Sequence, residues 1–328
     1  METDIRDYLE KISFGDMQIH HHVAVIPLFA GNGNGPDYLT MKEAMDGGFL
    51  TVSELSEGGH VPELKVINRA DWPVLLLDGE ELAGAKQNRV LNTTILLREH
   101  SETVIPVSCT EQGRWSYRSS HFEESGYIMS AHARRVKNES VSRSAKNKRG
   151  YDSDQGAVWE QIHAQSVAAK VHSPTVAMRD IHEAKKEDLD AYLEHFTLVQ
   201  EQKGLLVMIN GEVAGLDVLS NLSAFRILFP KLINSYVMDA ILSAPVSGKE
   251  PSRERASLFL QNILQCEEHK YDSVGYGSDY RYEGKKIVGS ALVHENTVIH
   301  MAFFQITETE KAGRMSPVSD RRAYRTNQ

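Results

Sequence analysis

The stretch that decides the fold is residues 74–89, VLLLDGEELAGAKQNR. It opens with four consecutive apolar residues, Val74 to Leu77, a pattern typical of a strand buried on both faces. Asp78-Gly79 then signals a turn, and polar residues continue to Arg89. Because an isolated buried charge is very costly, these polar side chains must either emerge at the end of the strand or be paired.

Short strands are predicted on both sides of this stretch. Residues 64–67 form an apolar run, residues 89–97 alternate between two sets of side chains, and residues 103–108 follow. Many short strands in succession indicate a sandwich, a barrel or a curled sheet. We therefore expect a strand-rich N-terminal half of one of these types.

The C-terminal half has a more helical pattern. Residues 186–200 carry apolar side chains at helical spacing, and two helices are predicted on either side of Pro230. Asn210-Gly211, between two apolar runs, is the strongest hairpin signal in the chain. Strands are predicted again over residues 271–305, so the fold class is α+β, with antiparallel strands added by the helical half.

These patterns divide the chain into four parts. Residues 1–118 form the strand-rich part with the candidate site, and residues 119–155 form a basic excursion or linker. Residues 156–307 form a helical and antiparallel α+β part, and residues 308–328 a polar tail predicted to be disordered. The basic run between Arg134 and Arg149 could recruit RNA or an acidic partner, but a solvated loop is the commoner explanation of such a run.

Composition limits the class of protein. The formal net charge of −9 argues against general nucleic-acid binding, which needs a basic surface. The two cysteines, Cys109 and Cys266, give no disulfide framework and fit a reducing compartment. The first residues are acidic and lack a signal-type apolar stretch, and no segment has the length of a membrane span. A cytoplasmic location is expected.

The first candidate site follows the buried strand. Glu80 and Glu81 could act as acid and base, or hold a divalent cation such as Mg²⁺, although the sequence identifies no cofactor. Lys86 and Arg89 could grip a phosphate or carboxylate. The alternative is a hairpin turn with a salt-bridged rim. Gln87 and Asn88, the remaining polar members, would orient ligand hydroxyls.

The second candidate site lies in residues 108–115, after the strand that ends at Val107. Arg114 and Trp115 offer a cationic fork beside an aromatic platform, a pair suited to planar anionic ligands. Glu111 could be a base or orient a ribose hydroxyl, and Gln112 could orient hydroxyls. Cys109 could be a nucleophile if its pKa were lowered, but a small buried core residue is the commoner role of a free cysteine.

A third run, His20-His21-His22, does not predict a metal site. Neighbouring residues of a strand point to opposite faces, so at most two of these rings share a side. No HExxH or CxxC motif supplies further ligands. No metal ligand is therefore assigned.

The two candidate stretches resemble the ARG-and-rhodanese-phosphatase-superfamily-associated protein domain, first type. The resemblance rests on residues 77–82, 84–93, 107–109 and 111–115, and extends more weakly from Gln155 to His300. The family name records an association with ADP-ribosylglycohydrolases and phosphatase-like proteins. By that association the resemblance implies a role near NAD or ADP-ribose metabolism, in stress or phage conflict. It supplies no catalytic residues.

Two hypotheses follow. In the first, the protein is an enzyme, of hydrolase or transferase type, or a binder that handles a phosphorylated ribose derivative such as ADP-ribose or NAD. Arg89 and Arg114 would hold phosphates, Trp115 would stack a base or ribose, and Glu80, Glu81 and Glu111 would supply catalytic or metal-binding carboxylates. In the second, the same residues form a structural network in a non-catalytic interaction module, whose basic loop binds an acidic partner. The oligomeric state is not predicted.

Overall fold

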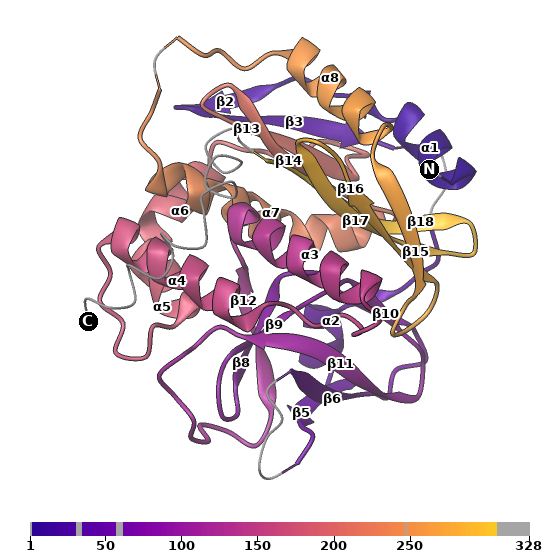
Figure 1. Cartoon of the computed structure of the whole chain (residues 1–328), viewed down its shortest axis with the longest axis vertical. Coiled ribbons are helices and arrows are strands. Elements are labelled where there is room, and N and C mark those ends of the chain that lie inside the picture. The colour runs from indigo at the N-terminus through magenta and orange to yellow at the C-terminus, as the bar shows by residue number, and fades with distance from the viewer. Residues whose placement is uncertain (1, 31–34, 57–61, 247, 307–328) are drawn as a thin grey trace.

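The largest sheet of the computed structural model combines both ends of the chain (Figure 1). The structure describes residues 2–30, 35–56, 62–246 and 248–306. Nine strands form this antiparallel sheet in the order β1-β3-β13-β14-β18-β17-β16-β15, with β2 also paired to β3. They are β1 (Ser13–Phe14), β2 (Gln18–His20), β3 (Val23–Phe29), β13 (Gly204–Ile209), β14 (Glu212–Leu219), β15 (Glu267–Asp272), β16 (Ser278–Glu283), β17 (Ile287–His294) and β18 (Thr297–Gln305).

A second sheet curls around an apolar interior made by residues 41–122. Its order is β12-β8-β9-β11-β6-β5, and β12 also contacts β5, so the sheet bends back toward itself. Three short strands form a separate sheet in the order β10-β7-β4. The bounds are β4 (Leu39–Thr40), β5 (Leu50–Glu54), β6 (Glu63–Asn68), β7 (Val74–Leu76), β8 (Glu80–Gly84), β9 (Arg89–Leu91), β10 (Ile95–Leu97), β11 (Ser101–Cys109) and β12 (Phe122–Ile128).

Helices cover both faces of the large sheet. The described residues contain α1 (Thr3–Glu10), α2 (Met41–Asp46), α3 (Ala131–Lys146), α4 (Gln155–Ala169), α5 (Met178–Ala184), α6 (Lys186–Leu193), α7 (Leu222–Leu242) and α8 (Arg253–Ile263). Of these, α1, α3, α7 and α8 contact the large sheet, whereas α2 contacts β4, β5, β7 and β12. Ala24, Ile26 and Leu28 of β3 pack with α1 and α8, whereas Val23 and Val25 face the core that contains α7. This alternation is what a strand covered on both faces produces.

The expected fold class is confirmed. The N-terminal half is strand-rich and curled, and the C-terminal half adds helices and antiparallel strands. The hairpin at Asn210-Gly211 joins β13 to β14, and both turn residues have positive φ. The prediction of two helices separated at Pro230 is wrong, because α7 continues through this proline. Its buried side chains lie on both sides of Pro230, so packing outweighs the lost backbone hydrogen bond.

The sequence suggested that the basic segment is a solvated loop, but most of it forms a helix. Residues 131–146 form α3, in which Arg134, Arg135 and Lys137 are buried. The helix contacts β14, β17 and β18 of the large sheet, while Lys137 reaches the curled sheet. The burial of Arg134 and Lys137 could not be predicted from the segment itself. A buried cation needs acceptors, and the acceptors of these two residues come from distant parts of the chain.

A buried polar network joins the two sheets through α3. Lys137 pairs with Asp78 and donates to the carbonyl oxygens of Leu91 and Asn92 at 2.8 and 3.0 Å. Arg134 donates to both carboxylate oxygens of Asp217 at 2.7 and 3.0 Å. Paired in this way, Arg134 and Lys137 hold the two sheets together, whereas Arg143 and Lys146 of the same helix are exposed.

No helix among the described residues is long and apolar enough to cross a membrane. The tail predicted to be disordered, residues 308–328, lies outside the described residues.

Candidate functional site

The two polar stretches predicted to share a site are adjacent. The N–H of Thr110 donates to the carbonyl oxygen of Asn88 at 3.0 Å, and β9 pairs with β11. The turn between β8 and β9 requires Gly84, which has a φ of 123°. A Cβ at this position would lie 2.9 Å from the carbonyl oxygen of His121. The tight turn therefore brings residues 84–89 against residues 110–114.

Arg114 and Glu111 fix this contact. All five N–H groups of Arg114 face protein acceptors: Glu111, Asn88, and the carbonyl oxygens of Gly84, Ala85 and Ser116. Burial alone would raise the pKa of Glu111, but the hydrogen bond and charge of Arg114 outweigh it and hold that pKa below its usual value. The Arg114 side chain thus anchors the loop that carries Trp115, and its donors are committed to the protein.

Glu80 points toward helix α7. It pairs with Lys231, whose ammonium also lies 3.0 Å from Glu124. The N–H of Leu77 donates to Glu80 at 2.9 Å. This carboxylate connects the curled sheet to α7 and lies apart from Arg114.

Glu81 is fully buried and faces the opposite side of β8 from Leu82, which lies in the apolar interior. The Thr110 hydroxyl donates to its Oε1 at 2.6 Å, and its Oε2 has no hydrogen-bond partner among the described residues. Burial raises the pKa of Glu81 to about 7. A carboxyl group with this pKa suits proton transfer near neutral pH.

The interior of the curled sheet contains a second pair of charged side chains, and several of its polar atoms lack hydrogen-bond partners. Arg89 of β9 and Glu54 of β5 are both buried, and Arg89 Nη2 lies 3.6 Å from Glu54 Oε1. Arg89 Nη1 donates to Gln87 Oε1 at 2.9 Å and lies 3.1 Å from the sulfur of Cys109. Within the described residues, Arg89 Nε and Nη2 and both oxygens of Glu54 have no hydrogen-bond partner. Buried polar atoms are nearly always satisfied, so this pair has capacity for a further group.

Aromatic side chains form the rim above this pair. Trp115 is 48% exposed and Tyr117 is 51% exposed. The Trp115 ring centroid lies 5.7 Å from the Arg89 guanidinium, and Lys86 Nζ lies 5.4 and 5.0 Å from the Trp115 and Tyr117 rings. Two cations and two aromatic rings therefore meet where the curled sheet opens to solvent. We call Arg89, Glu54, Lys86, Trp115 and Tyr117 the rim site.

Cys109 has the environment of a core residue. It is 1% exposed, and burial raises the pKa of its thiol. Gln155 of α4 holds its backbone through two hydrogen bonds, from the N–H at 2.7 Å and to the carbonyl oxygen at 2.9 Å. These features suit packing and oppose thiolate formation.

The structure gathers only part of the predicted set. Lys86, Gln87, Arg89 and Trp115 converge on the rim site, whereas Glu80, Glu81 and Glu111 face three other surroundings. The Asn88 side chain accepts from Arg114, and Gln112 is exposed. Sequence reasoning missed Glu54 and Tyr117. The alternation of Leu50, Val52 and Glu54 in the sequence could have indicated Glu54, because alternate residues of a strand lie on the same face.

No group of three or more His, Cys, Asp or Glu side chains in the described ranges is arranged to hold a metal ion. His20 instead stacks on the ring of His195, with centroids 3.6 Å apart.

Comparison with known proteins identifies the family. No curated protein and no solved structure matches the chain. A sequence model of the ARG and Rhodanese-Phosphatase-superfamily-associated Protein domain matches residues 11–304, which is nearly the whole chain. The chain therefore belongs to the ARG and Rhodanese-Phosphatase-superfamily-associated Protein domain family.

Proposed function

We propose that the protein binds a phosphorylated ribose derivative, of the ADP-ribose or NAD type, at the rim site. The observation that carries the proposal is the unsatisfied pair of Arg89 and Glu54, of which Arg89 lies beneath the Trp115 ring. Arg89 offers Nε–H and Nη2–H donors in the planar arrangement that suits phosphate. Glu54 offers two acceptors to the hydroxyl groups of a ribose.

The rim supplies the remaining part of such a ligand. Trp115 presents an exposed aromatic face on which a base can stack, and Lys86 adds positive charge beside it. Trp115 also covers Arg89, so the ring must rotate to admit the ligand. Rotation of an exposed side chain occurs within nanoseconds and is no obstacle to binding. The family association with ADP-ribose chemistry points to the same ligand class.

The test is isothermal titration calorimetry with ADP-ribose, NAD and related nucleotides, with and without Mg²⁺. The Trp115→Ala variant should weaken binding on the order of tenfold or more, because stacking of a base is worth about 1–3 kcal/mol. Trp72→Ala is the matched control, since Trp72 is 51% exposed and does not belong to the rim site. Absence of heat with every nucleotide, or equal loss in both variants, would refute the proposal.

A second candidate function, a non-catalytic module with a structural polar network, is favoured by a separate observation. Asp78, Lys137, Arg134 and Asp217 form buried pairs that connect the two sheets. Such a network stabilises the arrangement of the halves without needing a ligand. A folded protein that binds no nucleotide and depends on these pairs for its stability would support this candidate over the first.

A further inference from the structure

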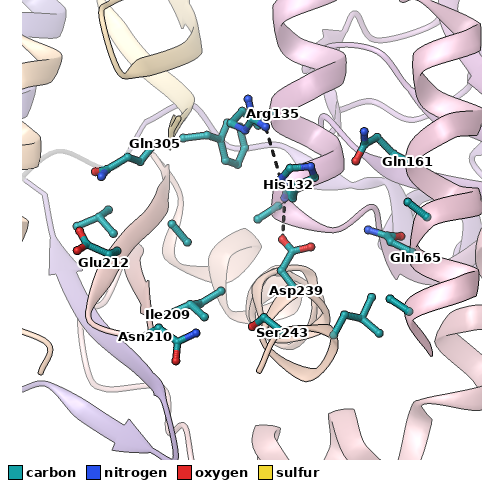
Figure 2. A pocket seen from close by; sticks show the side chains of 17 residues that line it. His132, Arg135, Gln161, Gln165, Ile209, Asn210, Glu212, Asp239, Ser243 and Gln305 are labelled. Carbon is teal, nitrogen blue, oxygen red and sulfur yellow. Dashed lines mark hydrogen bonds between the residues drawn. The ribbon is translucent and has the colours of Figure 1, made fainter. Parts of the chain in front are cut away.

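A cavity of about 490 Å³ lies away from the residues of the rim site (Figure 2). It is open to solvent and is bordered by α3, α4, the C-terminal end of α7, the β13–β14 hairpin and the end of β18. Cavities that hold small molecules typically measure about 300–1,000 Å³. The space is therefore of the right size for a small organic ligand.

Most of the cavity wall is apolar. Ala164 and Ala168 of α4 form one side, Leu242 of α7 another, and Ile209 and Val213 belong to the hairpin opposite. A wall of this kind gains free energy by covering the apolar surface of a ligand, at about 25 cal/mol per Å². The body of the ligand is therefore expected to be apolar.

One carboxylate is placed within this apolar wall. Asp239 of α7 lies near the middle of the view in Figure 2, beside His132, whose N–H donates to Asp239 Oδ2 at 2.7 Å. Asp239 is partly exposed, so it remains accessible from the cavity. Burial raises its pKa above the usual value for an aspartate, although His132, Ser130 and Arg135 act to lower it. Burial therefore disfavours the charged form more than these neighbours favour it.

The other charged side chains of the wall have partners of opposite charge. Arg135 pairs with Glu139 at 2.7 Å, and Glu212 pairs with Lys249 at 3.1 Å. Among the residues that line the cavity, Asp239 and Glu212 are negative and Arg135 is positive, so the lining has a formal excess of one negative charge. An ammonium group placed against the Asp239 carboxylate would form a charge-assisted hydrogen bond in apolar surroundings, where such bonds are strongest.

We propose that this cavity is a second ligand site, which takes an organic amine with a flat apolar body and binds its ammonium group at Asp239. The alanine-rich face of α4 provides room for the flat body, and the hairpin covers it from the other side. The site is independent of the rim site, because the two share no lining residue. Its failure would leave the proposed nucleotide binding unaffected.

The experiment uses tryptamine as the probe, with calorimetry on the full chain. Its neutral analogue 3-ethylindole and its anionic analogue indole-3-propionate test the need for the ammonium group. Asp239→Asn keeps an acceptor for the His132 N–H but removes the charge. We expect this variant to weaken tryptamine binding on the order of tenfold or more, as for the loss of a hydrogen bond to a charged group.

A cavity-filling variant gives the second arm. Ala168→Phe places a ring in the cavity from an exposed helical position, so the fold should be preserved and tryptamine binding lost. Val167→Phe is the matched control, because Val167 is 65% exposed on the same helix and does not line the cavity. Tryptamine binding that is absent, that survives Ala168→Phe, or that equals the binding of indole-3-propionate would overturn the proposal. Circular dichroism confirms that each variant is folded.

Discussion

The Asp217→Asn substitution tests how strongly the buried network holds the two sheets together. Asp217 is fully buried and accepts from Arg134 Nη1 and Nη2, from the Tyr236 hydroxyl at 2.7 Å, and lies 3.1 Å from His300 Nε2. The asparagine preserves size but removes the charge. Arg134 is then left with Asp78 at 3.5 Å as its nearest carboxylate.

The expected loss of stability is large. Removing one partner of a buried ion pair costs about 3–5 kcal/mol, because the other charge is left uncompensated. For a chain of 328 residues the unfolding entropy is about 0.7 kcal/mol/K, so the melting temperature should fall by about 4–7 °C. The double variant Arg134→Met with Asp217→Asn should lose less than the sum of the single variants, because it leaves no unpaired arginine.

The pH dependence gives a second check on the same residue. Burial alone would raise the pKa of Asp217, but Arg134 and His300 outweigh it and lower that pKa to about 2. The pair therefore contributes stability that is fully present above the unfolded value of 3.8 and is lost as pH falls toward 2. The difference between wild type and Asp217→Asn should be constant near neutral pH and shrink in acid.

Urea denaturation followed by circular dichroism measures these free energies. Lys186→Ala is the control, because its pair with Asp190 is exposed and its removal should leave the urea midpoint unchanged. A loss of less than about 1 kcal/mol for Asp217→Asn, or a loss no greater than that of the control, would refute the assignment of a strong buried pair.

Three further predictions follow from the predicted site residues. Folded Glu81 keeps its proton up to a pH of about 7, whereas the unfolded chain releases it near 4.5, so wild-type stability should fall by on the order of 3 kcal/mol between these values. The Glu81→Gln variant should lack this fall when the free energy of unfolding in urea is measured against pH. If wild type and variant showed the same dependence on pH, the prediction would be wrong. Arg114→Ala should lower the free energy of unfolding in urea by at least about 3 kcal/mol, because it leaves Glu111 unpaired in the interior. An unchanged free energy of unfolding would show that Arg114 is not an anchor. Cys109 should resist iodoacetamide in the native state and react in urea, because it is buried with a raised pKa, and rapid native alkylation followed by mass spectrometry would exclude this.

The sequence predicted those features of the fold that depend on neighbouring residues. The apolar run at Val74 to Leu77 indicated a buried strand, and Asn210-Gly211 indicated the hairpin that the structure contains. Ser252 is of a residue type that favours helix N-caps, and its side chain accepts from the N–H of Arg255 at the start of α8. Turn chemistry, capping and periodicity act over a few residues, so they can be read from one sequence.

The candidate site could be predicted only in outline. The hypothesis that Arg89 and Arg114 hold one ligand required residues 78–89 and 108–115 to lie together, and the two stretches are adjacent. The sequence could not say that Arg114 would be held by five acceptors while Arg89 would keep two unsatisfied donor atoms. Glu54, which approaches Arg89 from a strand 35 positions away, was not considered at all.

Only the tertiary structure decided which charges are buried and which partners they have. Lys231 meets Glu80 across 151 positions of the chain, and Thr94 meets His300 across 206. Pairing at such distances follows from sheet order and helix packing, and no local pattern encodes it. For the same reason the basic run at 134–149 looked solvated in the sequence, although in the folded chain α3 places Arg134 and Lys137 beside the carboxylates that neutralise them.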